Sequence, residues 1–142
     1  MTKKRVYVAG AISNGSLLQS LENIRKGIKL SVEVLKAGFA PFSPFIDFQF
    51  SFVEPITIDE YYGYSMAWLE VSDAVLLVPG YESSNGTLNE IKRARELDIP
   101  IFTSLEALKQ HFEFSPILQD IANVKNALDN NWGYSIFEKG EK

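Results

Sequence analysis

A glutamate at the start of a predicted helix is the first feature of this sequence that could do chemistry. Glu90 follows a small-residue turn, 80–86, which separates the apolar run 74–78 from a helix expected over 87–97. Ligands of open α/β sheets bind at the carboxyl ends of strands, where turn N–H groups and a helix N-terminus favour an anion. Glu90 could therefore act as a nucleophile or base; the alternative is an ordinary glutamate that satisfies the helix dipole.

A second glycine-containing turn, 10–16, follows a short apolar strand expected over 5–9. It lacks the lysine of a Walker loop and the three spaced glycines of the dinucleotide fingerprint. Its N–H groups and the Ser13 hydroxyl could still bind an anion, or the turn could simply cap the next helix. If the first and third strands are neighbours, the two turns flank one crevice.

Other catalytic arrangements find little support in the sequence. There is no cysteine, which excludes disulfides, zinc thiolates and a cysteine nucleophile. The single histidine, His111, stands beside Phe112 in a predicted helix, which argues against a serine triad. No His/Asp/Glu cluster has metal-ligand spacing, so we expect neither a metal nor an organic cofactor. Asp73 is expected to be a structural hydrogen-bonding residue, and Trp68 a core residue.

The elements that must position these residues alternate between strand and helix. Strands are expected over 5–9, 39–42, 73–78 and 99–102, and helices over 17–36, 59–71, 87–97, 104–112 and 116–128. This order predicts a single-domain α/β sandwich, flavodoxin-like or Rossmann-like, with a mostly parallel sheet of four or five strands. The domain is expected to cover 1–142, with a core over 5–112 and a C-terminal helix and tail over 113–142.

Two segments add detail to this arrangement. The first helix has apolar residues at intervals of three or four, which predict one stripe facing the sheet. The segment 43–58 is rich in phenylalanine and interrupted by prolines, so we expect an irregular functional loop there. The stripe consists of Leu17, Leu21, Ile24, Ile28, Val32 and Leu35.

Composition bears on location and partners. The 142 residues include 18 acidic and 14 basic side chains, a net charge of -4, which argues against a protein that coats nucleic acid. No apolar segment reaches the roughly 18 residues needed to span a bilayer, and the N-terminus lacks a signal-peptide core. We therefore expect a cytoplasmic protein that binds neither a nucleic acid polymer nor a membrane. The charge leaves room for a small-molecule partner, even a phosphorylated one, which needs only local donors.

Three segments taken together resemble the nucleoside 2-deoxyribosyltransferase-like superfamily. They are Tyr-Val-Ala-Gly-Ala-Ile-Ser-Asn-Gly at 7–15, Trp-Leu-Glu-Val-Ser-Asp-Ala-Val at 68–75, and the stretch from Ser84 to Glu90. The resemblance covers about residues 5–103 and is closest to the nucleotide N-hydrolase branch and related uncharacterised bacterial and phage proteins. It implies that Glu90 is the nucleophile that attacks C1′ of the sugar.

The resemblance also implies ligand contacts. Serine at position 84, where the transferases usually have aspartate, favours a phosphorylated ligand. Ser65 stands where an aspartate near the leaving base is usual, and Asp47, Asp59 or Glu60 could substitute for it. The implied phosphate-binding residues are Gly10, Ser13, Asn14, Gly15, Ser84 and Gly86. Ser65 and Tyr61 are expected to contact the ligand, and Tyr61, Tyr64, Phe45 and Phe48 to stack on the base unless they are core or dimer contacts.

The expected function is hydrolysis of the N-glycosidic bond of a (deoxy)nucleoside 5′-monophosphate. The alternatives are base exchange by a nucleoside deoxyribosyltransferase and a non-catalytic nucleotide-binding or sensor protein. We also expect a homodimer or a dimer of dimers, with helix 59–71 or the C-terminal tail at the interface. The tail carries Trp132, Tyr134 and Phe137, and its alternative place is over its own sheet edge.

Overall fold

The computed structural model describes residues 2–13 and 15–135, with side chains for 2–13, 15–113 and 120–130. The chain divides into two compact units, Met1–Leu108 and Lys109–Lys142. The first unit contains the sheet and most of the helices. Asn14 and Phe137 lie outside the described residues, and the side chains of Trp132 and Tyr134 are not described either.

The sheet has four parallel strands in the order β2-β1-β3-β4. They are β1 (Arg5–Ala9), β2 (Ala40–Phe42), β3 (Ala74–Leu77) and β4 (Ile101–Phe102). This is the beginning of the flavodoxin order, and it confirms the predicted α/β class. It also makes β1 and β3 neighbours, with Val6 opposite Ala74 and Ala9 opposite Leu77, so the two glycine-containing turns leave the sheet side by side.

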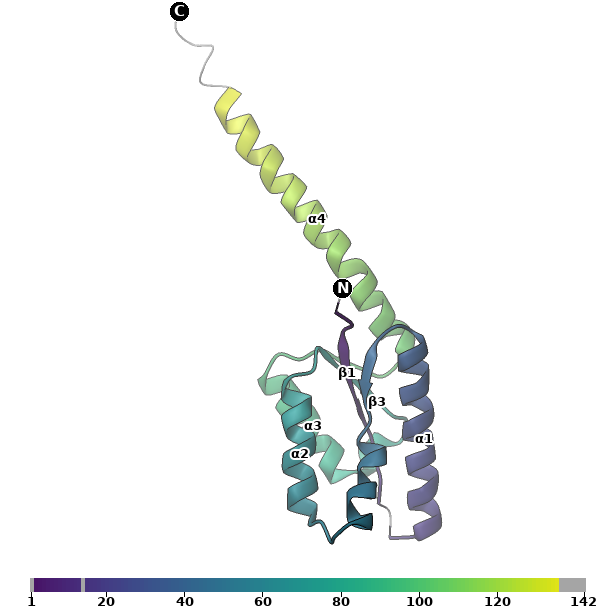
Figure 1. Ribbon diagram of the computed structural model, residues 1–142. Helices are drawn as coiled ribbons and strands as arrows, with labels where there is room; N and C mark the ends of the chain where they lie inside the picture. The colour runs from purple at the N-terminus through teal and green to yellow at the C-terminus, as the bar shows by residue number, and fades with distance from the viewer. Residues whose placement is uncertain (1, 14, 136–142) are drawn as a thin grey trace, which may run out of the picture. The chain divides into compact units, whose positions relative to one another are not determined.

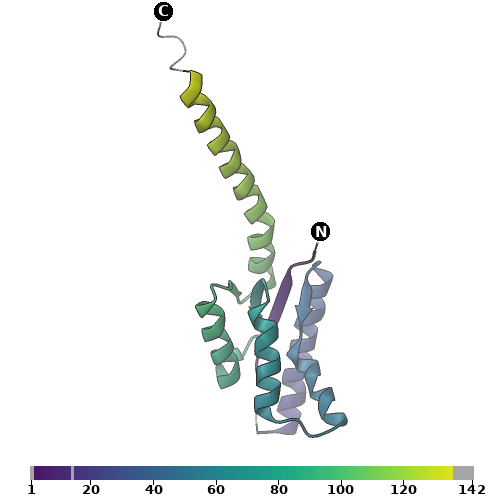
Figure 2. The ribbon, with the colours of Figure 1, turned by 60° about the vertical axis from the view of Figure 1, so that its left-hand side comes forward.

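Helices cover both faces of this sheet, as Figures 1 and 2 show. Helix α1 (Leu17–Lys36) lies on one face, and α2 (Ile58–Glu70) and α3 (Asn85–Glu96) lie on the other. Alternate strand residues point to opposite faces. Tyr7, Ala9, Val75 and Leu77 therefore form one core with Leu69 of α2 and with Ile91 and Ala94 of α3.

The inner face of α1 is not the one that its apolar spacing predicts. The buried helix residues are Gly27, Ser31 and Val34, whereas Leu17 is 78% and Leu21 is 53% exposed. The helix packs through small residues, and the Ser31 hydroxyl donates to the Gly27 carbonyl at 2.8 Å. Of the predicted stripe only Ile24 and Ile28, in its middle, are half-buried, so the prediction of one continuous sheet-facing stripe is wrong. Close packing at Gly27 sets the orientation of the helix instead.

The aromatic segment is regular where an irregular loop was expected. Residues Pro44–Phe52 form the 3-10 helix η1. Phe45 is 1% exposed and anchors this helix in a slot between Gly10 and Gly27. A Cβ atom at Gly27 would overlap the Phe45 ring, and one at Gly10 would lie 3.3 Å from Phe45 Cζ. The two glycines therefore admit the ring that holds η1 against the domain.

Asp73 and Trp68 differ in how far they match their predicted structural roles. The backbone N–H of Arg5 donates to Asp73 Oδ2 at 2.7 Å, which confirms the predicted hydrogen-bonding role of Asp73. Trp68 is 45% exposed and stacks on Phe42, with ring centroids 5.5 Å apart. It therefore lies at the edge of the core rather than inside it.

The C-terminal part is one helix, α4 (Leu105–Ser135), where two were predicted. The Ser104 hydroxyl caps its start by accepting from the Ala107 N–H at 3.2 Å. The helix passes through Pro116, although a proline inside a helix removes one hydrogen bond and crowds the preceding turn. Within the described part of the chain, no helix is both long enough and apolar enough to cross a membrane.

Candidate functional site

A cavity of about 530 Å³ opens at the carboxyl ends of β1 and β3. The turn after β1, helix η1 with the start of α2, and the start of α3 enclose it. Gly15 does not line it, and Asn14 lies outside the described residues. The structure brings the other predicted site residues together there: Gly10, Ser13, Tyr61, Ser65, Ser84, Gly86 and Glu90.

Gly10 allows the two turns to leave the sheet so close together. The N–H of Val78 donates to the Ala9 carbonyl at 2.8 Å, which extends the β1–β3 pairing up to the turns. A Cβ atom at Gly10 would lie 2.7 Å from Val78 Cβ, closer than side-chain atoms approach. The floor of the cavity thus requires glycine at the end of β1.

The start of α3 forms one wall of the cavity. Gly80 has a φ of 90°, which suits glycine, and the short 3-10 helix η2 (Tyr81–Ser83) follows it. The Ser84 hydroxyl accepts from the Thr87 N–H at 3.2 Å as the N-cap of α3. Because this hydroxyl oxygen accepts, its hydrogen remains available to a ligand. The N–H groups of Asn85 and Gly86 precede the first intrahelical bond, so they too can donate to an anion.

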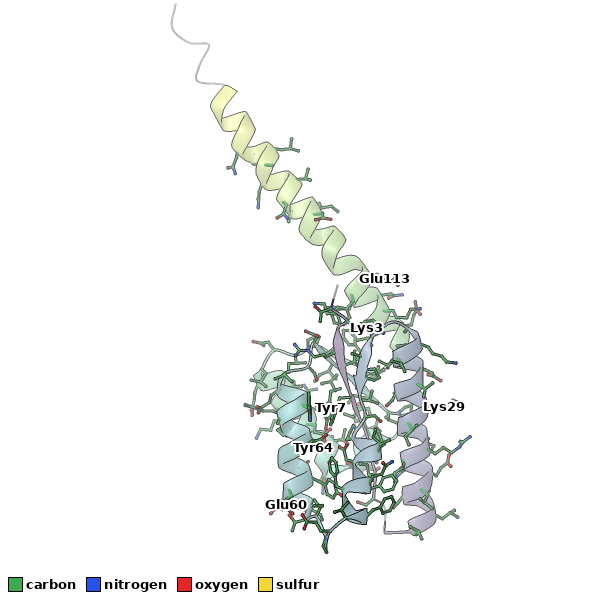
Figure 3. The ribbon with its side chains drawn as sticks, in the orientation of Figure 1. Lys3, Tyr7, Lys29, Glu60, Tyr64 and Glu113 are labelled. Carbon is green, nitrogen blue, oxygen red and sulfur yellow. The ribbon has the colours of Figure 1, made fainter. Side chains whose placement is uncertain are left out.

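Glu90 reaches the cavity from the next turn of α3. The hydroxyl of the fully buried Tyr7 donates to Glu90 Oε1 at 3.2 Å. In Figure 3 the Tyr7 side chain lies at the level of α2, between that helix and the strands. Burial raises the pKa of Glu90 to about 7, and the hydrogen bond from Tyr7 opposes this shift only in part. Glu90 is therefore partly ionised near neutral pH, as a nucleophile or base requires.

Tyr7 is a site residue that sequence reasoning missed. Burial, and then the charge of Glu90, raise its pKa far above the ordinary value, while a hydrogen bond with Ser65 opposes the shift. Its hydroxyl therefore keeps its proton and remains a donor. The available signal was a tyrosine within a buried apolar strand, since a buried tyrosine hydroxyl needs a partner. Ser65, predicted to contact the ligand, lines the cavity and also hydrogen-bonds Tyr7 from α2.

Of the three carboxylates considered as substitutes at Ser65, only Asp47 lines the cavity. It lies on η1 and is 9% exposed, and its Oδ2 is buried without a hydrogen-bond partner. Burial raises the pKa of Asp47 to about 6. Glu60, labelled near the N-terminal end of α2 in Figure 3, accepts from the Thr57 N–H at 2.7 Å in a capping box. Asp59 is exposed on the same helix turn.

The predicted base-stacking residues fall into two groups. Phe48 and Tyr61 line the cavity, and the Tyr61 and Ser51 hydroxyls are 2.6 Å apart. Phe45 contributes to the floor but is held in its glycine slot, so it acts as an anchor. Tyr64 lies away from the cavity and packs edge-on against Phe50, with centroids 5.4 Å apart.

The lining carries two carboxylates and no described basic residue. Among the residues that the structure describes, no cluster of three or more His, Cys, Asp or Glu side chains could hold a metal ion. His111 lies in the second unit, with its ring edge-on to Phe112 at 4.9 Å. The chemistry of the cavity therefore depends on carboxylates, hydroxyls and backbone N–H groups.

The cavity falls entirely within a recognised family segment. Residues 4–103 match the sequence model of a protein family described as a domain of unknown function, DUF4406. The segment includes all four strands and every cavity residue, and it ends before the second unit. No curated protein matches the sequence.

Proposed function

We propose that this chain, which belongs to the DUF4406 family, cleaves the N-glycosidic bond of a (deoxy)nucleoside 5′-monophosphate with Glu90 as nucleophile. The observation that carries the proposal is the setting of Glu90. Its carboxylate lies in a cavity at the carboxyl edge of a parallel sheet, held by a buried tyrosine hydroxyl. Retaining glycoside cleavage uses a carboxylate that bonds to the anomeric carbon.

The reaction has two steps. Ionised Glu90 bonds to C1′ while the C1′–N bond breaks. The electron pair of the C1′–N bond leaves with the base. Water then attacks C1′ of the glycosyl ester, and the bond to Glu90 breaks to regenerate the carboxylate. The Tyr7 hydroxyl holds one carboxylate oxygen, which leaves Oε2 to face the sugar. Burial raises the basicity of the ionised carboxylate and thus its reactivity.

The remaining walls suit the other parts of a nucleotide. A volume of about 530 Å³ lies in the range of small-molecule sites. Ser84, Gly86 and the Gly10–Ser13 turn offer neutral donors for the 5′-phosphate, two of them at a helix N-terminus. Phe48 and Tyr61 offer ring surfaces for the base.

A base-exchange transferase is the second candidate, and one observation favours it. Two carboxylates and no described basic residue line the cavity, which suits a neutral nucleoside better than an anion. In that reaction a second base, rather than water, would attack the glycosyl ester. The non-catalytic binder is the third outcome of the experiment below.

The experiment is incubation of the protein with matched panels of nucleoside 5′-monophosphates and nucleosides, with free base measured by chromatography. We expect base release from a monophosphate, and a loss of at least about 10³-fold in Glu90→Ala, because the nucleophile is gone. Glu90→Gln keeps the acceptor for Tyr7 and serves as the folding control, equally inactive. Near-normal turnover of Glu90→Ala contradicts the mechanism. Binding without turnover in the wild type identifies a sensor.

A calorimetric comparison decides between the two enzymes. We expect thymidine monophosphate to bind much more tightly than thymidine, and Ser84→Ala to weaken only the monophosphate. Equal affinities for the two ligands, together with base exchange in a mixture of nucleosides, support the transferase and contradict the phosphate assignment.

We extend the proposal to a homodimer or a dimer of dimers through α2. Tyr64, Trp68 and Val71 repeat at helical spacing and are 37%, 45% and 47% exposed, a partly exposed apolar row. Light scattering should give an oligomer mass. Deletion of the residues after Asp129 should leave that mass unchanged if α2 is the interface and lower it if the tail is. A monomer at micromolar concentration contradicts both.

A further inference from the structure

We propose that Asp47 is the general acid that protonates the departing base, an inference that rests on the function proposed above. Asp47 lines the same cavity as Glu90 and is 9% exposed. Its Oδ2 is buried and has no hydrogen-bond partner. Buried polar atoms in proteins are nearly always hydrogen-bonded, so an unpartnered carboxylate oxygen in a ligand cavity indicates that a ligand supplies the partner.

The two carboxylates approach the cavity from different walls. Glu90 comes from α3 and Asp47 from η1. The charges of both raise the pKa of the Tyr7 hydroxyl, with Glu90 the stronger influence. Only Glu90 of the two is hydrogen-bonded to Tyr7, whereas Asp47 acts on it through its charge. Asp47 is the neighbour of Phe48 on η1, and Phe48 and Tyr61 line the same cavity, so the proposal assigns Glu90 to the sugar and Asp47 to the side that offers rings to the base.

The competing residues are occupied elsewhere. Ser65 hydrogen-bonds Tyr7, and a serine hydroxyl is too weak an acid to protonate a base. Glu60 is held by the N–H and hydroxyl of Thr57, at 2.7 and 2.9 Å. Asp59 does not line the cavity. Asp47 is therefore the acid that remains in position.

The proton transfer completes the two-step reaction. As the C1′–N bond breaks, the Asp47 proton moves to a nitrogen or oxygen of the base, which leaves neutral. In the second step water gives its hydroxide to C1′ and its proton to Asp47, so one water is consumed and both carboxylates return to their starting states. Burial raises the pKa of Asp47 to about 6 and that of Glu90 to about 7, so the reactive form, with Asp47 protonated and Glu90 ionised, is the minor of the two singly protonated forms. The other titratable groups that line the cavity are Glu90, Tyr61 and Tyr62, with no described cation among the lining residues, and Tyr7 is close enough for the Asp47 charge to raise its pKa.

The test compares leaving groups. Asp47→Asn and wild type are assayed with a deoxynucleoside 5′-monophosphate and with 4-nitrophenyl 2-deoxyribose 5-phosphate, whose phenolate leaves without a proton. We expect Asp47→Asn to lose about 10²–10⁴-fold on the nucleotide and less than about tenfold on the nitrophenyl substrate. Asp59→Asn is the matched control and should retain activity on both. Glu90→Ala should lose both.

Each other result overturns the assignment. Equal losses of Asp47→Asn on both substrates indicate a structural role, and full nucleotide activity removes any role. The wild-type pH profiles give a reading that does not depend on the variant's folding. The nucleotide profile should fall on the alkaline side as Asp47 ionises, and the nitrophenyl profile should not; matching alkaline limbs contradict the proposal. If the wild type is inactive on both substrates, the proposed function and this inference fail together. If the wild type is active and only the Asp47→Asn variant departs from its expected pattern, this inference fails and the role of Glu90 stands.

Discussion

The two walls that carry the carboxylates are built in different ways. The α3 wall, residues 80–90, is held by backbone geometry: a left-handed glycine, an N-cap and a short 3-10 turn. The η1 wall, residues 44–52, is held by side-chain packing, with Phe45 in its slot and Phe50 stacked on Tyr61 at 6.4 Å. Glu90 has a hydrogen-bond partner in the protein, whereas Asp47 Oδ2 has none. The locally specified wall thus presents a carboxylate that a distant tyrosine holds, and the wall specified by side-chain packing presents a carboxylate with one buried oxygen that has no protein partner.

The largest expected effect on stability concerns the ionisation of Glu90. Its pKa rises from 4.5 to about 7 on folding, so its stabilising contribution is complete below about 4.5 and is lost as the pH rises through 7. At pH 8 the ionised side chain costs the fold at most about 3 kcal/mol, which Glu90→Gln should recover. Urea unfolding should therefore show a more stable variant at pH 8 and no difference at pH 4. A gain that is the same at both pH values contradicts burial as the cause.

Asp47→Asn provides the counterpart on the η1 wall. The pKa of Asp47 rises from 3.8 to about 6 on folding. Asp47→Asn should therefore also be more stable than the wild type, and the gain should develop at a lower pH than for Glu90→Gln. If the two variants differ in the pH at which the gain appears, each wall titrates on its own. If the two variants give the same curve of stability against pH, the carboxylates share a proton and the two walls do not titrate independently.

The second effect concerns the slot under the η1 wall. Gly27→Ala places a methyl group into the Phe45 ring and should cost about 1–3 kcal/mol of unfolding free energy. Gly63→Ala is the matched control: it lies within α2 with nothing within 4 Å of the added Cβ, and it should stabilise by about 0.5–1 kcal/mol. In NMR spectra of Gly27→Ala, shifts should concentrate over 44–52 and spare 85–96. Equal changes over both segments would show that the walls are not independent.

The smallest effect belongs to the α3 wall. Ser84→Ala removes the N-cap of α3 and should cost about 1 kcal/mol, whereas Ser84→Gly should cost only a few tenths. Thermal unfolding of the two variants measures the difference. Destabilisation by both to the same extent would mean that Ser84 is held by contacts other than its cap.

The same contrast explains what the sequence could predict. The strands and the Ser84–Glu90 wall were predictable, because turn residues, caps and apolar runs act over a few neighbouring positions. The flavodoxin-like class followed from the alternation of strands and helices, but the pairing of β1 with β3 was only a condition of the sequence argument. The approach of Gly10, Ser13 and Ser84 followed from the neighbouring β1 and β3 strands. Gly15, by contrast, lies outside the cavity lining although it belongs to the same turn.

The errors fall where distant contacts decide. Periodicity in α1 pointed to the leucine stripe, but Gly27 and Phe45 orient the helix. The regularity of η1 depends on the same ring. Tyr7 escaped notice because its partner, Glu90, lies 83 residues away in the chain. The single helix through Pro116 likewise has no local signal that outweighs proline's usual helix-ending role.

The glycine slot gives the assembly of the cavity an order in time. Its two sides are the end of β1 and the middle of α1, so no slot exists until these elements have docked. We therefore expect Phe45 to enter afterwards, and Asp47 to be fixed in place later than Glu90, whose wall forms from adjacent residues. We expect the reverse order under mild denaturation. A form with η1 released would retain the sheet, the helices and the nucleophile but would have lost the acid, so base release should fail before helical structure is lost.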